Sequence, residues 1–112
     1  MVRKYVPRRG DVVWLTFSPQ AGHEQSGRRP AVAISPKPYN VKVGLALFCP
    51  ITSQVKGYPF EVALPEGYNI TGVILADQIK SLDFVARNAE FIFRLPDEIL
   101  AELLGKIRTL VE

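Results

Sequence analysis

The sequence predicts a mainly β protein with added α structure: a small, strongly curved antiparallel sheet or half-barrel that carries one C-terminal helix on one side. Prolines and glycines divide the first three quarters of the chain into short apolar runs of about strand length. The last sixteen or so residues change to the apolar period of a helix. The chain has 112 residues, near the common domain size, so we expect one domain over residues 1–112.

The first predicted strand is Asp11–Phe17, which is rich in β-branched and aromatic residues and lies between Gly10 and Ser18-Pro19. Five further runs have the same character. They are Ala31–Ser35, Gly44–Ile51, Phe60–Leu64, Gly72–Gln78 and Glu90–Leu95. None repeats at a fixed period, so a solenoid is not expected.

The predicted helix covers Pro96–Val111. Its apolar residues fall at positions 99, 100, 103, 104, 107, 110 and 111, which form one helical face. A proline in the first turn, acids after it and Lys106 with Arg108 near the end all suit the helix dipole. A shorter helical turn around 82–87 is a second expectation.

Proline also restricts the residue that precedes it to extended or turn geometry. This applies to Ser18, Arg29, Ser35 and Lys37, each of which is followed by proline. Arg29 is therefore expected at the entrance of a strand and not in a helix.

Composition limits the function classes only loosely. The chain is 47% hydrophobic and 22% charged, which is typical of a globular protein. A net charge of +3 permits an anionic partner without requiring one. The single cysteine, Cys49, excludes an internal disulfide and follows an apolar run, so we expect a buried structural thiol. No apolar stretch approaches the roughly 20 residues of a membrane span, and we expect a soluble, cytoplasmic protein with no membrane partner.

The most informative segment is Glu24–Val32, read together with Pro50–Ser53. The first places a carboxylate and two arginines just before an apolar strand, and the second places hydroxyls at the end of another. If the two strands are neighbours, Arg29 and Thr52 meet across them. An arginine fork beside a hydroxyl suits the oxygens of a phosphodiester.

These residues belong to an ordered series of motifs through which the chain resembles the MazF/Kid (PemK-like) endoribonuclease toxins of bacterial toxin–antitoxin pairs, most closely the MazF branch. The resemblance covers most of the chain up to about residue 83. Its motifs are Val6-Pro7, Gly10–Trp14, Gly22, Glu24–Gly27, Arg29–Val32, Ser35-Pro36, Pro50–Gln54, Lys56–Val62 and Ala76–Ser81.

The resemblance implies an SH3-like barrel with a C-terminal helix, a homodimer, and metal-independent cleavage of single-stranded RNA at short sequence motifs. It places the functional arginine on Arg29 and the functional threonine on Thr52, with Glu24 in the same loop. The residue before the arginine is commonly histidine in this family and is Arg28 here. The implied partners are single-stranded RNA (mRNA, with rRNA or tRNA as further substrates) and a MazE-like antitoxin.

RNA carries its own nucleophile, the 2′-hydroxyl, so such an enzyme needs alignment, charge stabilisation and two proton transfers. We assign Arg29 to charge stabilisation, because a guanidinium is too basic to act as a general base. Glu24 is the hypothetical proton acceptor and Thr52 a donor to a phosphate oxygen. The products are a 2′,3′-cyclic phosphate and a 5′-hydroxyl.

Aromatic, amide and basic groups suit unstacked bases and the RNA backbone. The predicted RNA contacts are Phe17, Gln25, Arg28, Ser53, Gln54, Lys56 and Gln78. His23 is the single histidine, and we expect it to be a solvated loop residue. With one histidine and one cysteine the sequence shows no ligand spacing for a metal, and no cofactor is expected.

Two alternatives stay open from the sequence. Without the family resemblance, Arg28-Arg29 would be a solvated surface pair, and Thr52 with Ser53 would be turn hydroxyls. The rival functional class is a non-catalytic toxin or binding module of the same fold that acts by protein contact, for instance on DNA gyrase.

Overall fold

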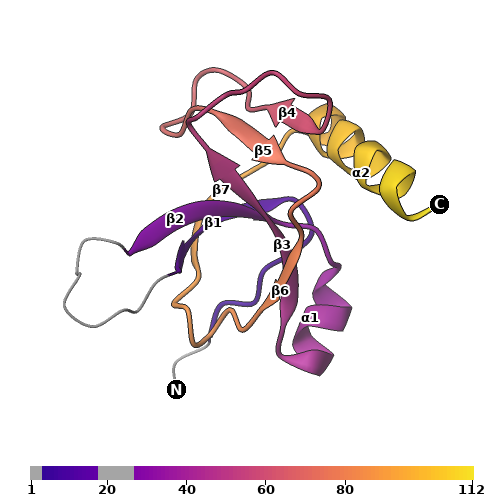
Figure 1. The fold of residues 1–112 in the computed structure, drawn as a ribbon. Helices are drawn as coiled ribbons and strands as arrows, with labels where there is room; N and C mark the ends of the chain where they lie inside the picture. Colours follow the sequence, from indigo (N-terminus) through magenta and orange to yellow (C-terminus); the bar gives the residue numbers. More distant parts are fainter. Residues whose placement is uncertain (1–3, 18–26) are drawn as a thin grey trace.

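The computed structural model describes residues 4–17 and 27–112, which contain seven strands and two helices (Figure 1). In chain order they are β1 (Asp11–Thr16), β2 (Arg28–Ala33), α1 (Lys37–Val43), β3 (Ala46–Thr52), β4 (Glu61–Ala63), β5 (Val73–Leu75), β6 (Lys80–Leu82), β7 (Glu90–Arg94) and α2 (Asp97–Val111).

The strands form one antiparallel sheet in the order β4-β5-β3-β2-β1-β7. Strand β3 is shared: its first half pairs with β6 and its last two residues pair with β5. Among the described strands β4, β6 and β7 each pair with one other strand, so the sheet stays open instead of closing into a barrel. It is strongly curved (Figure 1). The predicted class, a curved antiparallel sheet with a C-terminal helix, is confirmed.

Both faces of the central strands are covered. Along β1, Val12 faces one buried cluster and Val13 with Leu15 faces a second, following the two-residue period of a strand. The first cluster lies against α2 and includes Leu103. The second includes Phe48 and is covered by the N-terminal segment and the turn after β6. This two-sided burial explains the nearly continuous apolar run of β1.

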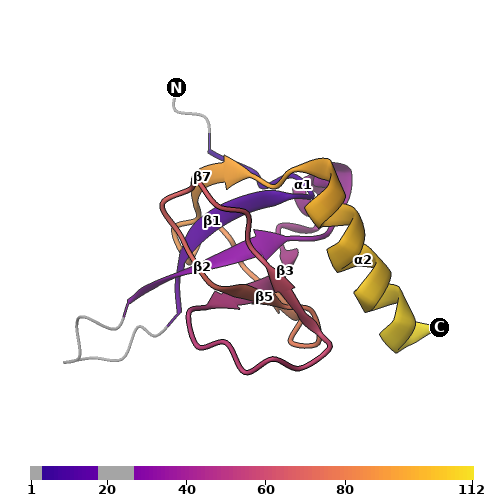
Figure 2. The same cartoon turned by 90° about the horizontal axis from the view of Figure 1, so that it is seen from above.

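Helix α2 matches the predicted range within one residue and lies along one side of the sheet (Figure 2). Its apolar face packs on the first cluster. Lys106 Nζ donates hydrogen bonds to the carbonyl oxygens of Pro59, at 2.6 Å, and Glu61, at 3.0 Å. Neither helix of the described ranges is long and apolar enough to cross a membrane.

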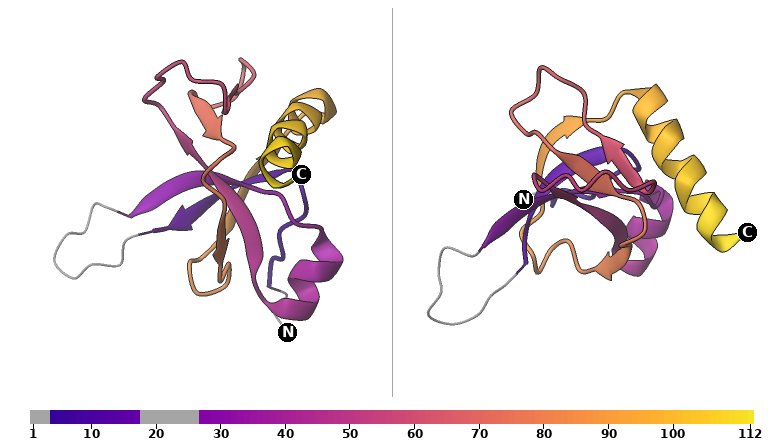
Figure 3. Two further views of the ribbon diagram at one scale, coloured as in Figure 1. Left: turned by 45° about the vertical axis from the view of Figure 1, so that its right-hand side comes forward. Right: turned by 45° about the horizontal axis from the view of Figure 1, so that its top comes forward.

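The structure differs from the local expectations in two places. Residue Lys37 is helical, because a proline at the second position of a helix lacks only an amide that would be unpaired in any case. Helix α1, which lies beside β3 in both views of Figure 3, was therefore not predicted. Strand β6 is a three-residue pairing with no apolar signal. The short helical turn expected around 82–87 is present as a single turn, in which the Arg87 amide donates to the Asp83 carbonyl oxygen at 3.1 Å.

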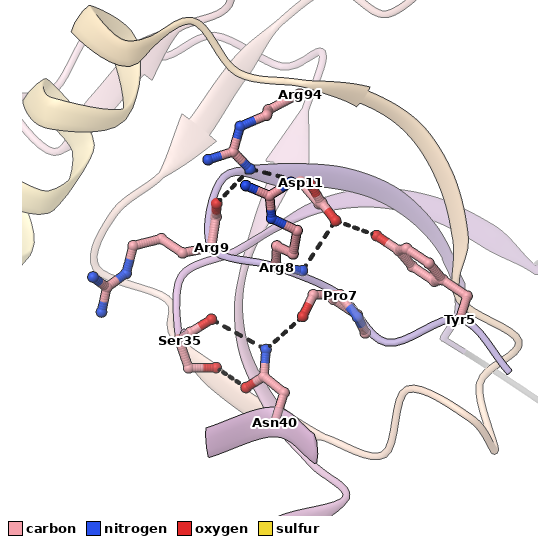
Figure 4. Close-up of polar contacts among 8 residues, drawn as sticks. All are labelled: Tyr5, Pro7, Arg8, Arg9, Asp11, Ser35, Asn40 and Arg94. Carbon is pink, nitrogen blue, oxygen red and sulfur yellow. Dashed lines mark hydrogen bonds and ion pairs between the residues drawn. The ribbon is translucent and has the colours of Figure 1, made fainter. Parts of the chain in front are cut away.

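A buried polar network connects the N-terminal segment to the sheet and α1 (Figure 4). The Asn40 side chain donates to the carbonyl oxygens of Pro7, at 2.9 Å, and Ser35, at 3.1 Å. Nearby, the Asp11 carboxylate accepts hydrogen bonds from the Tyr5 hydroxyl and the Arg8 amide. These buried polar groups are therefore satisfied, as a stable fold requires.

Candidate active site in a cationic groove

The site begins with the pairing of β2 and β3, which are neighbours in the sheet, the condition that the sequence analysis set for Arg29 and Thr52 to come together. The observed register pairs Ala31 with Pro50 and Ala33 with Phe48. Arg29 and Thr52 each lie two residues beyond the Ala31–Pro50 pair, where Arg29 pairs with Leu15 of β1 and Thr52 pairs with Val73 of β5. Alternation puts both side chains on the face of Phe48, the side of the second core cluster.

On this face the sheet is hollowed by a cavity of about 500 Å³. Its lining residues come from β2, β3, β5 and β6, from the residue after β1 and from the segments that flank β6. They are Phe17, Arg29, Phe48, Pro50, Ile51, Thr52, Leu75, Gln78, Lys80, Leu82 and Arg87.

A second hollow of about 370 Å³ adjoins it. The two share Arg29, Ile51 and Thr52, so the Arg29–Thr52 pair stands at the junction between them. Ser53, Gln54 and Thr71 line the second hollow as well. We call the two hollows together the groove.

The groove is cationic. Arg29, Lys80 and Arg87 line the larger cavity, and among the described residues no carboxylate lines either hollow. Phe17 adds an aromatic ring with the Arg87 guanidinium 5.9 Å from its centroid. The three cations attract an extended polyanion such as a nucleic-acid backbone. The uncharged, partly apolar wall between them can contact its bases.

The Thr52 hydroxyl is fixed by the turn that follows it. The Gln54 amide donates to Thr52 Oγ1 at 3.1 Å, so a lone pair of the oxygen is occupied. Within the described ranges no protein group accepts the hydroxyl proton. The hydroxyl can therefore donate toward a ligand in the groove, which suits an oxygen of a phosphate.

Two other arginines hold the base of the β1–β2 hairpin. The Arg28 guanidinium donates to Thr16 Oγ1 at 3.0 Å and to the Asn88 carbonyl oxygen at 2.8 Å, and pairs with Glu90 at 2.9 Å. Arg87 donates to the carbonyl oxygen of Thr16 at 3.0 Å. The turn after β6 is thus tied to the strand ends that lead into residues 18–26.

The structure brings most of the described site residues of the sequence analysis together. Phe17, Ser53, Gln54 and Gln78 line the groove with Arg29 and Thr52. Arg28 and Lys56 do not line it. Arg28 has the protein contacts given above, and Lys56 lies in the loop whose amides at 56 and 57 donate to the Glu61 carboxylate. Their contacts with RNA stay predictions.

Glu24, Gln25 and His23 lie outside the described residues. Sequence reasoning missed Lys80, Arg87 and Thr71. Lys80 belongs to the motif Ala76–Ser81, which was a usable signal. Arg87 and Thr71 had none, because only the folded sheet brings them to β3.

Cys49 is fully buried in the first core cluster, which confirms the predicted structural thiol. Burial, with a smaller effect of the Asp77 charge, raises the pKa of the thiol to about 12. Such a thiol is a poor nucleophile. Within the described ranges no three His, Cys, Asp or Glu side chains gather as a metal site.

Comparison with known proteins gives consistent matches along the chain. The family described as PemK-like, MazF-like toxin of type II toxin-antitoxin system matches residues 8–111. The endoribonuclease toxin MazF of Escherichia coli K12 is 48% identical over 111 residues, covering 99% of this chain and 99% of that protein. The endoribonuclease PemK of Escherichia coli is 34% identical, with 99% and 90% coverage.

A crystal structure of MazE–MazF from Deinococcus radiodurans superposes with a TM-score of 0.89 at 53% identity, covering 96% of this chain and 97% of the other. Sequence and fold therefore agree over nearly the full length of both chains. The chain belongs to the PemK-like, MazF-like toxins of type II toxin–antitoxin systems.

Proposed function

We propose that this endoribonuclease toxin cleaves single-stranded RNA in the groove, with the scissile phosphate at the Arg29–Thr52 pair. The observation that carries the proposal is that Arg29 and Thr52 both line both hollows. One RNA strand can therefore run from one hollow into the other past these two side chains. The relatives' names support the reaction class, since they are called endoribonucleases.

The proposed reaction uses the oxygen that the substrate supplies. The 2′-oxygen attacks the adjacent phosphorus, the bond from phosphorus to the 5′-oxygen breaks, and a 2′,3′-cyclic phosphate and a 5′-hydroxyl result. The proton of the 2′-hydroxyl passes to a base, for which we propose Glu24, and the leaving 5′-oxygen takes up a proton. Arg29 stabilises the charge on the phosphoryl oxygens, and Thr52 donates a hydrogen bond to one of them.

The two hollows receive the nucleotides on either side of that phosphate. The larger one offers the Phe17 ring for stacking and Gln78 for a base edge, with Lys80 and Arg87 for the backbone. The smaller one offers the polar side chains of Ser53, Gln54 and Thr71. Arg28, Gln25 and Lys56 are proposed as outer RNA contacts.

We further propose a homodimer that is inhibited by a MazE-like antitoxin with an acidic, disordered segment. The solved MazE–MazF complexes support the antitoxin. A cationic groove attracts an acidic chain and offsets the cost of ordering it. The proposed substrate is mRNA, with rRNA or tRNA as further substrates. We accordingly propose that the toxin acts in the cytoplasm.

The decisive experiment incubates purified protein with single-stranded RNA in EDTA, beside a copy with 2′-hydrogens. We expect the RNA to be cut and the deoxy copy to survive. Arg29→Ala and Thr52→Ala should each lower kcat by about 10²-fold or more, the usual cost of losing a transition-state donor.

Arg108→Ala and Thr109→Ala are the matched controls, since both residues are exposed on α2 away from the groove. Full activity in Arg29→Ala or Thr52→Ala would contradict the site. Intact RNA with the wild-type protein would contradict the reaction and favour a toxin that acts by protein contact.

A further inference from the structure

Gly72 packs directly against the peptide that carries Thr52. It precedes β5, and the pairing of Thr52 with Val73 brings it beside the end of β3. A Cβ atom at position 72 would lie 2.1 Å from the Thr52 carbonyl oxygen and 2.8 Å from the carbonyl carbon. The Gly72 φ of +127° is also one that L side chains rarely adopt. Only glycine permits this approach.

Gly72 is also held from its other side. The Leu64 amide, just after β4, donates to the Gly72 carbonyl oxygen at 3.1 Å. A side chain at 72 therefore meets backbone on one side while the residue is tied to backbone on the other. The Thr52–Ser53 peptide is then the part that has to move.

That peptide is part of the groove. Thr52 and Ser53 line the smaller hollow, and the Gln54 amide that fixes Thr52 Oγ1 follows directly. A separation that grows from 2.1 Å to the 3.4 Å of ordinary contact moves the peptide by 1.3 Å. A misplacement of about 1 Å can already cost an enzyme about 10²-fold.

We propose that Gly72 is a positioning residue for RNA cleavage: by lacking a side chain it lets the start of β5 close onto the Thr52–Ser53 peptide and hold the Thr52 hydroxyl at the scissile phosphate. This inference rests on the proposed function. Gly72 acts through Thr52 and does not line the groove itself.

The test compares Gly72→Ala with Gly67→Ala. Gly67 lies in the same β4–β5 connection, has a φ of +96°, and has open space where its Cβ would be. Both variants place an L residue at positive φ, but only Gly72→Ala displaces the site. Cleavage rates are normalised to the folded fraction from circular dichroism.

We expect Gly72→Ala to lower kcat by about 10²-fold with KM within about threefold, because the groove cations still bind RNA. Gly67→Ala should stay near the wild-type kcat. In a Thr52→Ala background Gly72→Ala should add little, since the hydroxyl that it misplaces is absent. The NMR signal of the Gln54 amide should shift in Gly72→Ala and not in Gly67→Ala.

Three results would overturn the inference. The first is an equal kcat in the two glycine variants, and the second is a rise in KM in place of the fall in kcat. The third is a full further loss of kcat when Gly72→Ala is added to Thr52→Ala. A Gly72→Ala protein that never folds also overturns it, because Gly72 would then serve the fold and not the site. Wild-type protein that leaves RNA intact overturns the proposed function as well, whereas active wild type with active Gly72→Ala overturns this inference alone.

Discussion

Arg29 on β2 and Thr52 on β3 line both hollows of the groove together. Each comes from a strand end, where a central strand of the sheet leaves the buried core. Strand pairing holds the backbone of each residue, Arg29 beside Leu15 and Thr52 beside Val73, while both side chains line the groove. This is the arrangement that a preorganised charge stabiliser needs.

Arg29→Lys tests whether the guanidinium fork matters beyond its charge. Lysine keeps the cation but loses the two parallel donors that match phosphate oxygens. We expect kcat to fall by about tenfold or more, and by less than in Arg29→Ala. Single-turnover cleavage at saturating RNA measures it. Equal rates for the lysine and wild-type proteins would reduce the role of Arg29 to that of a point charge.

Lys80→Ala tests the electrostatic part of binding. Lys80 lines the larger cavity, and its loss removes one cation that the RNA backbone would neutralise. The slope of log K against log salt should become shallower by about 0.7 for a single strand. Binding of the deoxy copy, which is not cut, measures the slope. Lys42→Ala on α1, an exposed lysine outside the groove, should leave it unchanged.

Arg28→Ala separates a structural role from RNA contact. The guanidinium joins β2 to Thr16, to the turn carbonyls and to Glu90, whose side chain is 70% exposed. We expect unfolding free energy to fall by about 1 kcal/mol, the scale of a partly exposed ion pair with hydrogen bonds. Denaturant titration gives this value. A large loss of RNA affinity without a loss of stability would instead assign Arg28 to the RNA.

Tyr5→Phe tests the polar network at the N-terminal segment. Burial, together with the hydrogen bond to Asp11, raises the pKa of Tyr5 well above its usual value of 10.0. Near neutral pH the variant should lose about 1–2 kcal/mol, because the buried Asp11 loses a donor.

The pH dependence has a definite sign. Above pH 10.0 an unfolded tyrosine releases its proton while the native one keeps it, so native stability falls as pH rises. The difference in unfolding free energy between wild type and Tyr5→Phe should therefore have its full value below that pH and shrink above it. Denaturant titrations across this range measure the difference, and a gap that widens with pH would contradict the assignment.

Chemical labelling of the buried Cys49 thiol reports whether the protein core is folded. With the pKa of the thiol raised to about 12, reaction with a disulfide reagent at about pH 8 should be negligible in the native protein and fast in denaturant. Cys49→Ala should keep full cleavage activity per folded molecule. Rapid labelling of the native protein would contradict the burial of the thiol.

The amino-acid sequence determined much of this protein. The apolar period change at Pro96 defined α2, and the proline after Arg29 kept that residue at a strand. The short apolar runs defined β1 and the approximate positions of most other strands. Local chemistry suffices for these features, because period, proline and charge act over a few residues.

Only the tertiary structure decided which residues surround the Arg29–Thr52 pair. Arg87 and Thr71 come to the groove from distant segments, and Arg28 turns away from its neighbour into contacts with Glu90. Helix α1 is joined to the N-terminal segment by the buried Asn40 side chain, which donates to the Pro7 carbonyl oxygen. The need for glycine at position 72 arises only from the nearby Thr52 carbonyl group. Each of these depends on a contact between residues remote in the chain, and such contacts exist only after the sheet has folded.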